Sequence, residues 1–304
     1  MKRDFLTIWD LSRIEIEGLL RRAIDLKSGL DSNKCPLIGK SIGLFFEKPS
    51  TRTRVSFEVG IYQLGGHAIC LNPKEIQLGR GETIADTAKV LSRYLSAVIL
   101  RTYSHSSIEE FALHSTIPVI NGLSDMHHPC QAIADLMTIL EKKRRLNGIR
   151  LAYIGDGNNV ANSLIGAAAR TGIEMIIACP KGFEPDQDVL KRARNKEDTE
   201  NTGEIIIVRD PKEAASNADV IYTDVWVSMG QEKEAAKRKA KFKNYQINKK
   251  LLQYAKKDAI VLHCLPANRG QEITDDVMDG TNSAVFDQAE NRLHTGKALL
   301  EFLL

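Results

Sequence analysis

The residues best suited to chemistry begin directly after an apolar stretch, Ser41 to Phe46, which predicts a strand. Residues 47–54 read Glu-Lys-Pro-Ser-Thr-Arg-Thr-Arg and open a helical pattern. The start of a helix favours an anion, and hydroxyl and guanidinium groups hold phosphate oxygens in a fixed geometry. The alternative is that Ser50 or Thr51 caps the helix and the arginines are solvated, but a cap needs one hydroxyl. The segment therefore predicts a phosphate site.

A second polar corner, His128-Pro129-Cys130-Gln131, precedes a long helical pattern. An imidazole N–H and a carboxamide at this corner could reach the same carbonyl or amide group. The alternatives are a surface turn, or a metal site formed with His127 and Cys130. Because adjacent histidines point in different directions and a fourth ligand is missing, we disfavour the metal.

The loop from Asp224 to Gly230 follows another short strand pattern and contains a carboxylate and a hydroxyl but no Lys or Arg. A dicarboxylate substrate would need cations here, whereas a diamino acid needs an acceptor for its ammonium group. The loop therefore favours a diamino acid.

Two further strand ends carry polar residues. Gly155-Asp156-Gly157-Asn158-Asn159-Val160 suggests a dinucleotide fingerprint, but Val160 replaces the third glycine and the next strand ends without an acidic residue, which disfavours a nicotinamide cofactor. We interpret Asn158 as a local turn residue.

His263 and Cys264 close an apolar strand, so their side chains should point to opposite faces and not form a catalytic pair with each other. We expect Cys264 to have Asp224 as a neighbour on an adjacent strand.

Together these motifs resemble ornithine carbamoyltransferase, within the aspartate and ornithine carbamoyltransferase family: Ser-Thr-Arg-Thr-Arg, His-Pro-Cys-Gln, Asp224 with Ser228-Met229-Gly230, and His263-Cys264-Leu265-Pro266 occur in the family's order. The resemblance spans nearly the whole chain. It implies two domains with the active site in the cleft between them, no metal or organic cofactor, and a homotrimer or a multiple of trimers. It also implies a cis peptide at Leu265-Pro266.

The resemblance assigns roles that the residues alone leave open. A free cysteine at a strand end is often only a small buried hydrophobe, but here Cys264 becomes catalytic together with Arg101, His128 and Asp224. Ornithine binding is implied for Asn159, Asp224, Ser228 and Met229. Carbamoyl phosphate binding is implied for Ser50, Thr51, Arg52, Thr53, Gln77, Arg101, His128, Gln131, Cys264, Leu265 and Arg292. The sequence alone would leave Gln77 and Arg292 exposed to solvent.

The reaction that these roles imply moves the carbamoyl group of carbamoyl phosphate to the side-chain amine of L-ornithine, giving citrulline and phosphate in arginine biosynthesis. Ser50 to Arg54 would hold the departing phosphate. One alternative is a related transferase acting on putrescine or an N-acylornithine. The non-enzyme alternatives are a ligand sensor and a basic RNA-binding protein.

Composition excludes several other classes. The chain has 304 residues, a net charge of +3, and apolar runs far shorter than the ~18 residues of a membrane span. We expect no membrane partner and no secretory signal, and five widely spaced cysteines without a Cys-x-x-Cys pair favour a reducing, cytoplasmic setting. Residues 231–250 hold eight basic residues, including Arg238, which we interpret as a solvated helical face and not a nucleic-acid patch.

Short strand patterns alternate with helical ones, which predicts an α/β fold with mostly parallel sheets that bind ligands at the carboxyl ends of their strands. Residues 1–135 plus 289–304 are expected to form a carbamoyl phosphate-binding domain, and 136–288 a Rossmann-like ornithine-binding domain. Strands are predicted at 41–46, 68–71, 97–101, 118–121, 150–154, 174–178, 204–208, 220–223, 259–262 and 283–286. Helices are predicted at 50–64, 83–92, 108–114, 131–145, 161–171 and 289–304.

Overall fold

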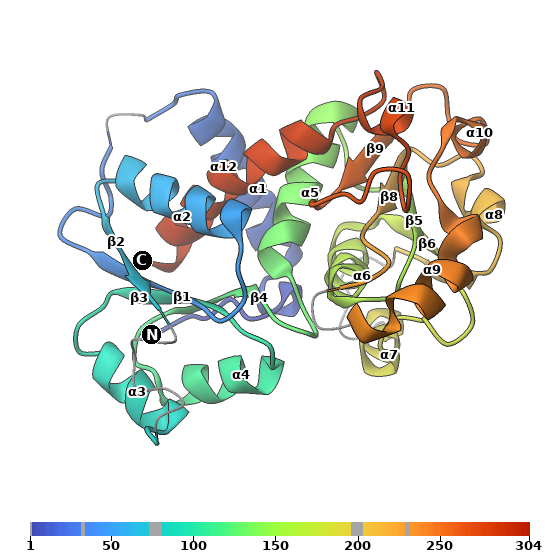
Figure 1. Cartoon of the computed structure of the whole chain (residues 1–304). Coiled ribbons are helices and arrows are strands. Elements are labelled where there is room, and N and C mark those ends of the chain that lie inside the picture. Colours follow the sequence, from blue (N-terminus) through green and yellow to red (C-terminus); the bar gives the residue numbers. More distant parts are fainter. Residues whose placement is uncertain (1, 32–33, 73–80, 196–202, 229–231) are drawn as a thin grey trace. The chain divides into compact units, whose positions relative to one another are not determined.

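The computed structural model describes residues 2–31, 34–72, 81–195, 203–228 and 232–304. The chain divides into two compact units, residues 1–137 with 290–304 and residues 138–289. Each unit is built on its own parallel sheet with helices on both faces (Figure 1). Among the described residues, no helix combines the length and the apolar composition needed to cross a bilayer.

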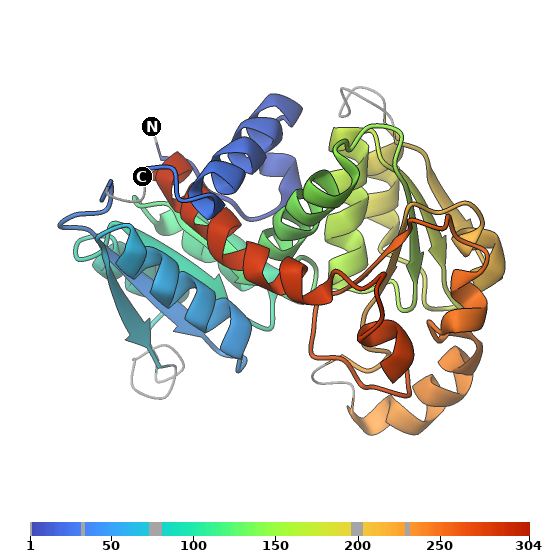
Figure 2. The same ribbon diagram turned by 90° about the horizontal axis from the view of Figure 1, so that it is seen from above.

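The first unit contains a four-stranded sheet in the order β2-β1-β3-β4. Helices α1 and α2 lie on one face of this sheet and α3 and α4 on the other (Figures 1 and 2). The strands are β1 (Ser41–Phe46), β2 (His67–Leu71), β3 (Ala97–Arg101) and β4 (Val119–Leu123). The helices are α1 (Arg13–Lys27), α2 (Thr51–Gln63), α3 (Ile84–Leu91) and α4 (His105–His114), after a short 3-10 helix at Ile8–Asp10.

The second unit contains a five-stranded sheet in the order β7-β6-β5-β8-β9, with all neighbouring pairs parallel. The strands are β5 (Arg150–Ile154), β6 (Glu174–Ala178), β7 (Ile205–Val208), β8 (Val220–Thr223) and β9 (Ile260–His263). The helices are α6 (Asn159–Thr171), α7 (Gln187–Arg194), α8 (Pro211–Ala215), α9 (Ala235–Phe242), α10 (Lys249–Leu252) and α11 (Asp275–Met278), with 3-10 turns at Glu232–Glu234 and Lys243–Tyr245.

Two long helices pass along the chain from one unit to the other: α5 (Pro129–Lys143) and α12 (Val285–Leu303). The first unit is therefore made from both ends of the chain, while the second is a continuous insertion. In both sheets the central strands are apolar on both faces, as parallel strands covered by helices are, whereas the edge strand β2 is partly exposed. All five residues of β3 are buried, for example.

The predicted α/β fold is confirmed, and β1, β3, β5, β6 and β8 have the predicted bounds. The strand predicted at 283–286 is wrong. Ser283 makes only an isolated bridge to Val261, and the chain enters α12 at Val285, four residues before the predicted helix start. A four-residue apolar run is too short for its pattern to distinguish a strand from a first helical turn. Helices α1, α7, α8 and α11 were not predicted, and α9 and α10 were covered only by the helical face expected for residues 231–250.

Candidate active site

The ends of β1 and β3 lie side by side, because Phe46 is the register partner of Arg101. The chain runs from β1 to β2 on one side and returns to β3 on the other, and such a switch point is where parallel sheets bind ligands. Ser50 caps α2, and its Oγ accepts the backbone N–H of Thr53 at 3.3 Å. Thr51 and Arg52 occupy the first turn of α2. The predicted phosphate segment therefore combines a helix start with a switch point.

Buried cations lie at the same edge. Arg101 is the last residue of β3 and is 6% exposed. Lys48 is also buried, with its Nζ 4.4 Å from the centroid of the Tyr103 ring. Burial, and then repulsion from Arg101, lowers the pKa of Lys48. Cations held in a low-dielectric environment attract an anion more strongly than solvated ones do.

A chain of hydrogen bonds connects three helices of the first unit. Arg292 donates from Nη1 to Oε1 of Gln131 at 2.6 Å and from Nη2 to Oγ1 of Thr53 at 2.9 Å. Gln131 in turn donates from Nε2 to Oδ1 of Asp135 at 2.8 Å. These four side chains are buried, so Arg292 is not the solvent-exposed residue that its sequence context alone suggests. The chain fixes which way the Gln131 amide points.

His128 stands just before α5 and is 6% exposed. Burial is the main reason why the pKa of His128 lies well below its ordinary value, and the charges of Arg292, Arg101 and Arg52 lower it further. The imidazole is therefore neutral near pH 7 and can offer an N–H without adding a charge. This suits a donor to a carbonyl oxygen in a site already rich in arginine.

The metal site considered for His127, His128 and Cys130 has little chemical support. The Cys130 thiol donates to the backbone oxygen of Asn121 at 3.3 Å, and burial raises its pKa to about 12. Metal ligation needs a thiolate. The His127 ring packs edge-on against that of His105, with 5.0 Å between centroids.

Arg54 differs from the expectation that Ser50 to Arg54 would all hold phosphate. Its Nε lies 2.9 Å from Oε1 of Glu58 one turn further along α2, and 56% of its side chain is exposed. Gln77 lies outside the described residues, as does Met229 in the other unit.

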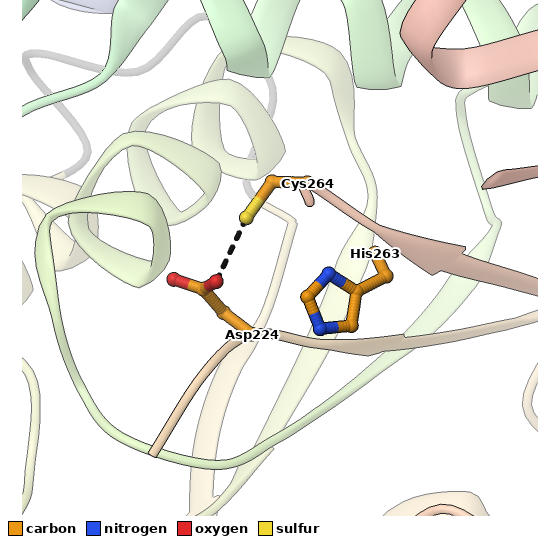
Figure 3. A group of neighbouring side chains, drawn as sticks. All are labelled: Asp224, His263 and Cys264. Atoms are coloured by element: carbon orange, nitrogen blue, oxygen red, sulfur yellow. Dashed lines mark hydrogen bonds between the residues drawn. The ribbon is translucent and has the colours of Figure 1, made fainter. Parts of the chain in front are cut away.

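In the second unit, the ends of β5, β8 and β9 are adjacent, with the switch point between β5 and β8. Asp224 follows β8 and Cys264 follows β9. The Cys264 thiol lies 2.8 Å from Oδ1 of Asp224 (Figure 3), so the two residues are neighbours, as predicted. Nδ2 of Asn158 donates to Oδ2 of Asp224 at 2.7 Å. A buried carboxylate thus stands at the centre of a polar cluster.

Asn158 has a larger part than the local one predicted for it. Its Oδ1 accepts the backbone N–H groups of Val160 and Ala161, so it forms the expected local turn and also caps α6. Its amide nitrogen also reaches Asp224 on a neighbouring strand end. Asn159, the residue to which the family resemblance gives a role, occupies the first position of α6. No sequence pattern indicates the contact between Asn158 and Asp224, because that contact depends on the pairing of β5 with β8.

His263 and Cys264 have separate partners. Nδ1 of His263 accepts the backbone N–H of Leu265 at 2.9 Å, and Nε2 lies 3.2 Å from Oε1 of the buried Glu272. Leu265 has a φ of 58° and precedes Pro266 in a cis peptide bond, as the resemblance implied. Ser228, half-buried, ends the described part of the loop that begins at Asp224.

Within the described ranges, Asp224, His263 and Cys264 are the one group whose potential ligand atoms lie close enough for a metal, all within 4.8 Å of one another (Figure 3). The hydrogen bonds do not fit a metal. Both ring nitrogens of His263 are engaged, one by an N–H donor and the other by a carboxylate. The imidazole therefore has no lone pair left for an ion.

The sequence did not reveal one buried ion pair beside this cluster. Nη1 of Arg238 on α9 lies 2.9 Å from Oδ2 of Asp156, which follows β5. Arg238 is 7% exposed, so it does not belong to the solvated face expected for residues 231–250. That face is formed by lysines, which are exposed: Lys233, Lys237, Lys239, Lys241, Lys243, Lys249 and Lys250. Phe242 and Tyr245 are buried and offer no stacking surface to a nucleic acid.

Comparison with known proteins identifies the family to which this chain belongs. A model described as "Aspartate/ornithine carbamoyltransferase, carbamoyl-P binding domain" matches residues 3–141, and one described as "Aspartate/ornithine carbamoyltransferase, Asp/Orn binding domain" matches residues 147–303. The chain is 55% identical to the ornithine carbamoyltransferase of Anoxybacillus flavithermus, over 99% of this chain and 96% of that protein. The solved ornithine carbamoyltransferase of Pyrococcus furiosus is 52% identical with a TM-score of 0.93, covering 98% of this chain and 96% of that one. The chain belongs to the aspartate/ornithine carbamoyltransferase family.

Proposed function

We infer that this chain is an ornithine carbamoyltransferase, which transfers the carbamoyl group of carbamoyl phosphate to the side-chain amine of L-ornithine and releases L-citrulline and phosphate. The observation that supports it most is the Asp224 cluster, in the part of the chain matched by the Asp/Orn binding model. Asp224 offers a buried carboxylate to an ammonium group. The loop 224–230 contains no Lys or Arg for a second substrate carboxylate, which disfavours aspartate.

Carbamoyl phosphate is assigned to the switch point of the first unit, in the part matched by the carbamoyl-P binding model. The hydroxyls and amides of Ser50, Thr51 and Thr53 together with Arg52 would hold the phosphate. Arg101, His128 and Gln131 would bind the carbamoyl oxygen and amide, and Arg292 fixes Thr53 and Gln131. The family resemblance also assigns Cys264 and Leu265, which follow β9, to carbamoyl phosphate.

The chemistry requires a neutral amine. An alkylammonium has a pKa near 10.4, so deprotonation at pH 7 costs about 4 kcal/mol. Asp224 and Cys264 surround the ammonium and assist the loss of its proton, while Asn159 and the Ser228-Met229 segment hold the amino acid end. The amine then attacks the carbamoyl carbon and forms the C–N bond. The C–O bond to phosphate breaks, and the nitrogen loses its second proton.

Charge development identifies what the protein must stabilise during this attack. Negative charge grows on the carbamoyl oxygen and on the departing phosphate. Arg101 and the neutral His128 serve the first, and Arg52 with the start of α2 serves the second. Holding both substrates in line supplies the remaining rate enhancement, so the reaction needs no metal or organic cofactor.

The test is citrulline formation from carbamoyl phosphate and ornithine by the wild-type protein and two arginine variants. Arg52→Ala should raise the KM for carbamoyl phosphate by about tenfold or more, because a charge-assisted bond to phosphate is lost. Arg54→Ala is the matched control on the same helix, since Arg54 pairs with Glu58. It should change that KM by less than about twofold.

Two results would contradict the proposal. Absence of citrulline with the wild-type protein would reject the activity, and an Arg52→Ala variant with wild-type kinetics would reject the phosphate assignment. Offering putrescine and N-acetylornithine in place of ornithine tests acceptor choice. We expect both to be poor acceptors, because Asn159 and Ser228 are assigned to the free amino acid end.

We further propose a cytoplasmic homotrimer, or a multiple of trimers, within arginine biosynthesis. The support is the family membership and the five cysteines, none of which forms a disulfide. A solution mass measurement tests the assembly directly. A monomer at working concentration would overturn this part of the proposal and leave the reaction untouched.

A further inference from the structure

Arg238 on α9 connects the two loops that carry the proposed ornithine contacts. Its Nη1 donates to Oδ2 of Asp156 at 2.9 Å and to the backbone oxygen of Trp226 at 3.1 Å. Asp156 lies three residues before Asn159. Trp226 lies between Asp224 and Ser228. One guanidinium therefore joins α9 to the loop after β5 and to the loop after β8.

The ion pair is enclosed. Asp156 and Arg238 are 6% and 7% exposed, and the Arg238 Cζ lies 4.9 Å from the centroid of the Phe183 ring. The indole ring of Trp226 also stacks on the Phe242 ring, with 6.0 Å between the ring centroids. A buried pair of this kind has few alternative geometries, since each charge must keep its partner.

A relay of contacts leads from this pair to Asp224. The backbone oxygen of Asp156 accepts the Tyr153 hydroxyl at 2.9 Å and the Asn158 N–H at 2.8 Å. Asn158 in turn donates to Oδ2 of Asp224 at 2.7 Å. The position of Asp156 therefore determines where Asn158 places its amide, and so how Asp224 is oriented.

The charges also favour this arrangement. Burial raises the pKa of Asp156 to about 6; the positive charge of Arg238 opposes this rise, and the negative charge of Asp224 adds to it. Arg238 provides the positive charge that lets both carboxylates share this corner. The ornithine ammonium can then be matched by Asp224.

We propose that Asp156 and Arg238 are positioning residues for ornithine, which set the loops after β5 and β8 in the geometry that binds the amino acid. The inference rests on the proposed function, because it assigns a specific substrate to these loops. It predicts an effect confined to one of two substrates. A pair that served only folding would affect both substrates through the amount of intact protein.

The experiment measures KM for each substrate, kcat and the thermal midpoint for Asp156→Asn and Arg238→Lys. The lysine keeps the charge but cannot hold both Asp156 and the Trp226 oxygen with the guanidinium geometry. We expect KM for ornithine to rise about tenfold or more, with kcat changing less than that KM and KM for carbamoyl phosphate staying within about twofold.

Asp219→Asn is the matched control. Asp219 is a buried aspartate of the same unit, 4% exposed, whose Oδ1 lies 2.8 Å from Lys256 Nζ and whose Oδ2 accepts the Arg150 N–H at 2.9 Å. It precedes β8 at the opposite end of the strands from Asp224. It should lower the thermal midpoint and leave the KM for ornithine unchanged.

The double variant Asp156→Asn with Arg238→Gln tests whether the two residues act as a unit. Removing both charges leaves no unpaired buried ion, so its KM for ornithine should be no higher than that of the worse of its two component single variants, Asp156→Asn and Arg238→Gln, which are measured beside it. The inference would be overturned if the increases in KM for ornithine of the single variants multiplied in the double variant. It would also be overturned if the KM values for both substrates rose equally, or if Asp219→Asn raised the KM for ornithine as much. Failure of the proposed function is distinct, because it would show as absence of ornithine turnover in the wild-type protein.

Discussion

At the scale of residues, the site combines cations that are held by burial with a histidine that is kept neutral. His128 is buried among Arg292, Arg101 and Arg52, and a further positive charge there would be repelled. A neutral imidazole can donate a hydrogen bond to an oxygen that gains negative charge without competing with phosphate for the arginines. The lowered pKa of His128 therefore serves the reaction and costs acid stability.

That cost can be measured. An unfolded histidine has a pKa near 6.5, and the folded pKa of His128 is lower. The contribution to stability is therefore complete above pH 6.5 and is lost as the pH falls from there towards the folded pKa, because the unfolded chain takes up a proton that the fold excludes. Between pH 7.5 and 5.5, wild type should lose about 1 kcal/mol more unfolding free energy than His128→Gln.

Urea unfolding at the two pH values, without carbamoyl phosphate, checks this difference. His67→Gln removes an exposed histidine of the same unit and serves as the control. Equal acid sensitivity in wild type and His128→Gln would contradict the lowered pKa, because the folded imidazole would then take up a proton as readily as the unfolded one.

At the scale of elements, the loop after β5 is fitted closely against another part of its unit. Gly157 donates its N–H to the backbone oxygen of Phe183 at 2.9 Å. A Cβ at Gly157 would lie 2.2 Å from the Pro185 nitrogen and 2.4 Å from the Glu184 carbonyl carbon, both backbone atoms. The loop that carries Asp156, Asn158 and Asn159 can keep its place only without a side chain here.

Gly157→Ala should therefore lower the free energy of unfolding by about 1–3 kcal/mol through overpacking, and raise the KM for ornithine more than that for carbamoyl phosphate. Gly18→Ala is the control, because Gly18 lies within α1 and an added Cβ would meet nothing within 4 Å. That change should be neutral or stabilising by up to about 1 kcal/mol. Wild-type stability in Gly157→Ala would contradict the close fit.

At the scale of the whole molecule, the chain passes out of the first unit at residue 137 and returns to it at residue 290. The returning segment of α12 contributes the buried Ala298, Leu299 and Leu300 to the first unit. An ion pair also joins this segment to α1, since Nε of Arg22 lies 2.6 Å from Oε2 of Glu301. The first unit is complete only when the last residues have been made.

A chain ending at residue 289 should therefore lose the first unit and keep the second. Each buried leucine contributes about 1.5–3 kcal/mol, and Arg292 would no longer hold Thr53 and Gln131. Limited trypsin digestion followed by mass spectrometry should leave a fragment near residues 138–289. Rapid loss of that fragment, or persistence of residues 1–137, would contradict this division of the chain.

The sequence by itself determined the α/β class, the bounds of the most apolar strands and the polar residues at their ends. Parallel strands covered on both faces must be continuous apolar runs, and ligands bind where those runs stop. For this reason Ser50 and Asp224 could be named from residue type and position, whereas the family motifs were needed for Arg101 and for the catalytic role of Cys264.

Only the tertiary structure decided how these side chains pair. Arg238 reads as one cation in a basic run, yet it is buried against Asp156, 82 residues away along the chain. Asn158 reads as a local turn residue, yet it also reaches Asp224, and Arg292 reads as exposed, yet it holds Gln131. Sequence periodicity reports which face of an element is apolar. It does not report which strand end or helix lies opposite, and that pairing sets burial, charge balance and hydrogen bonding.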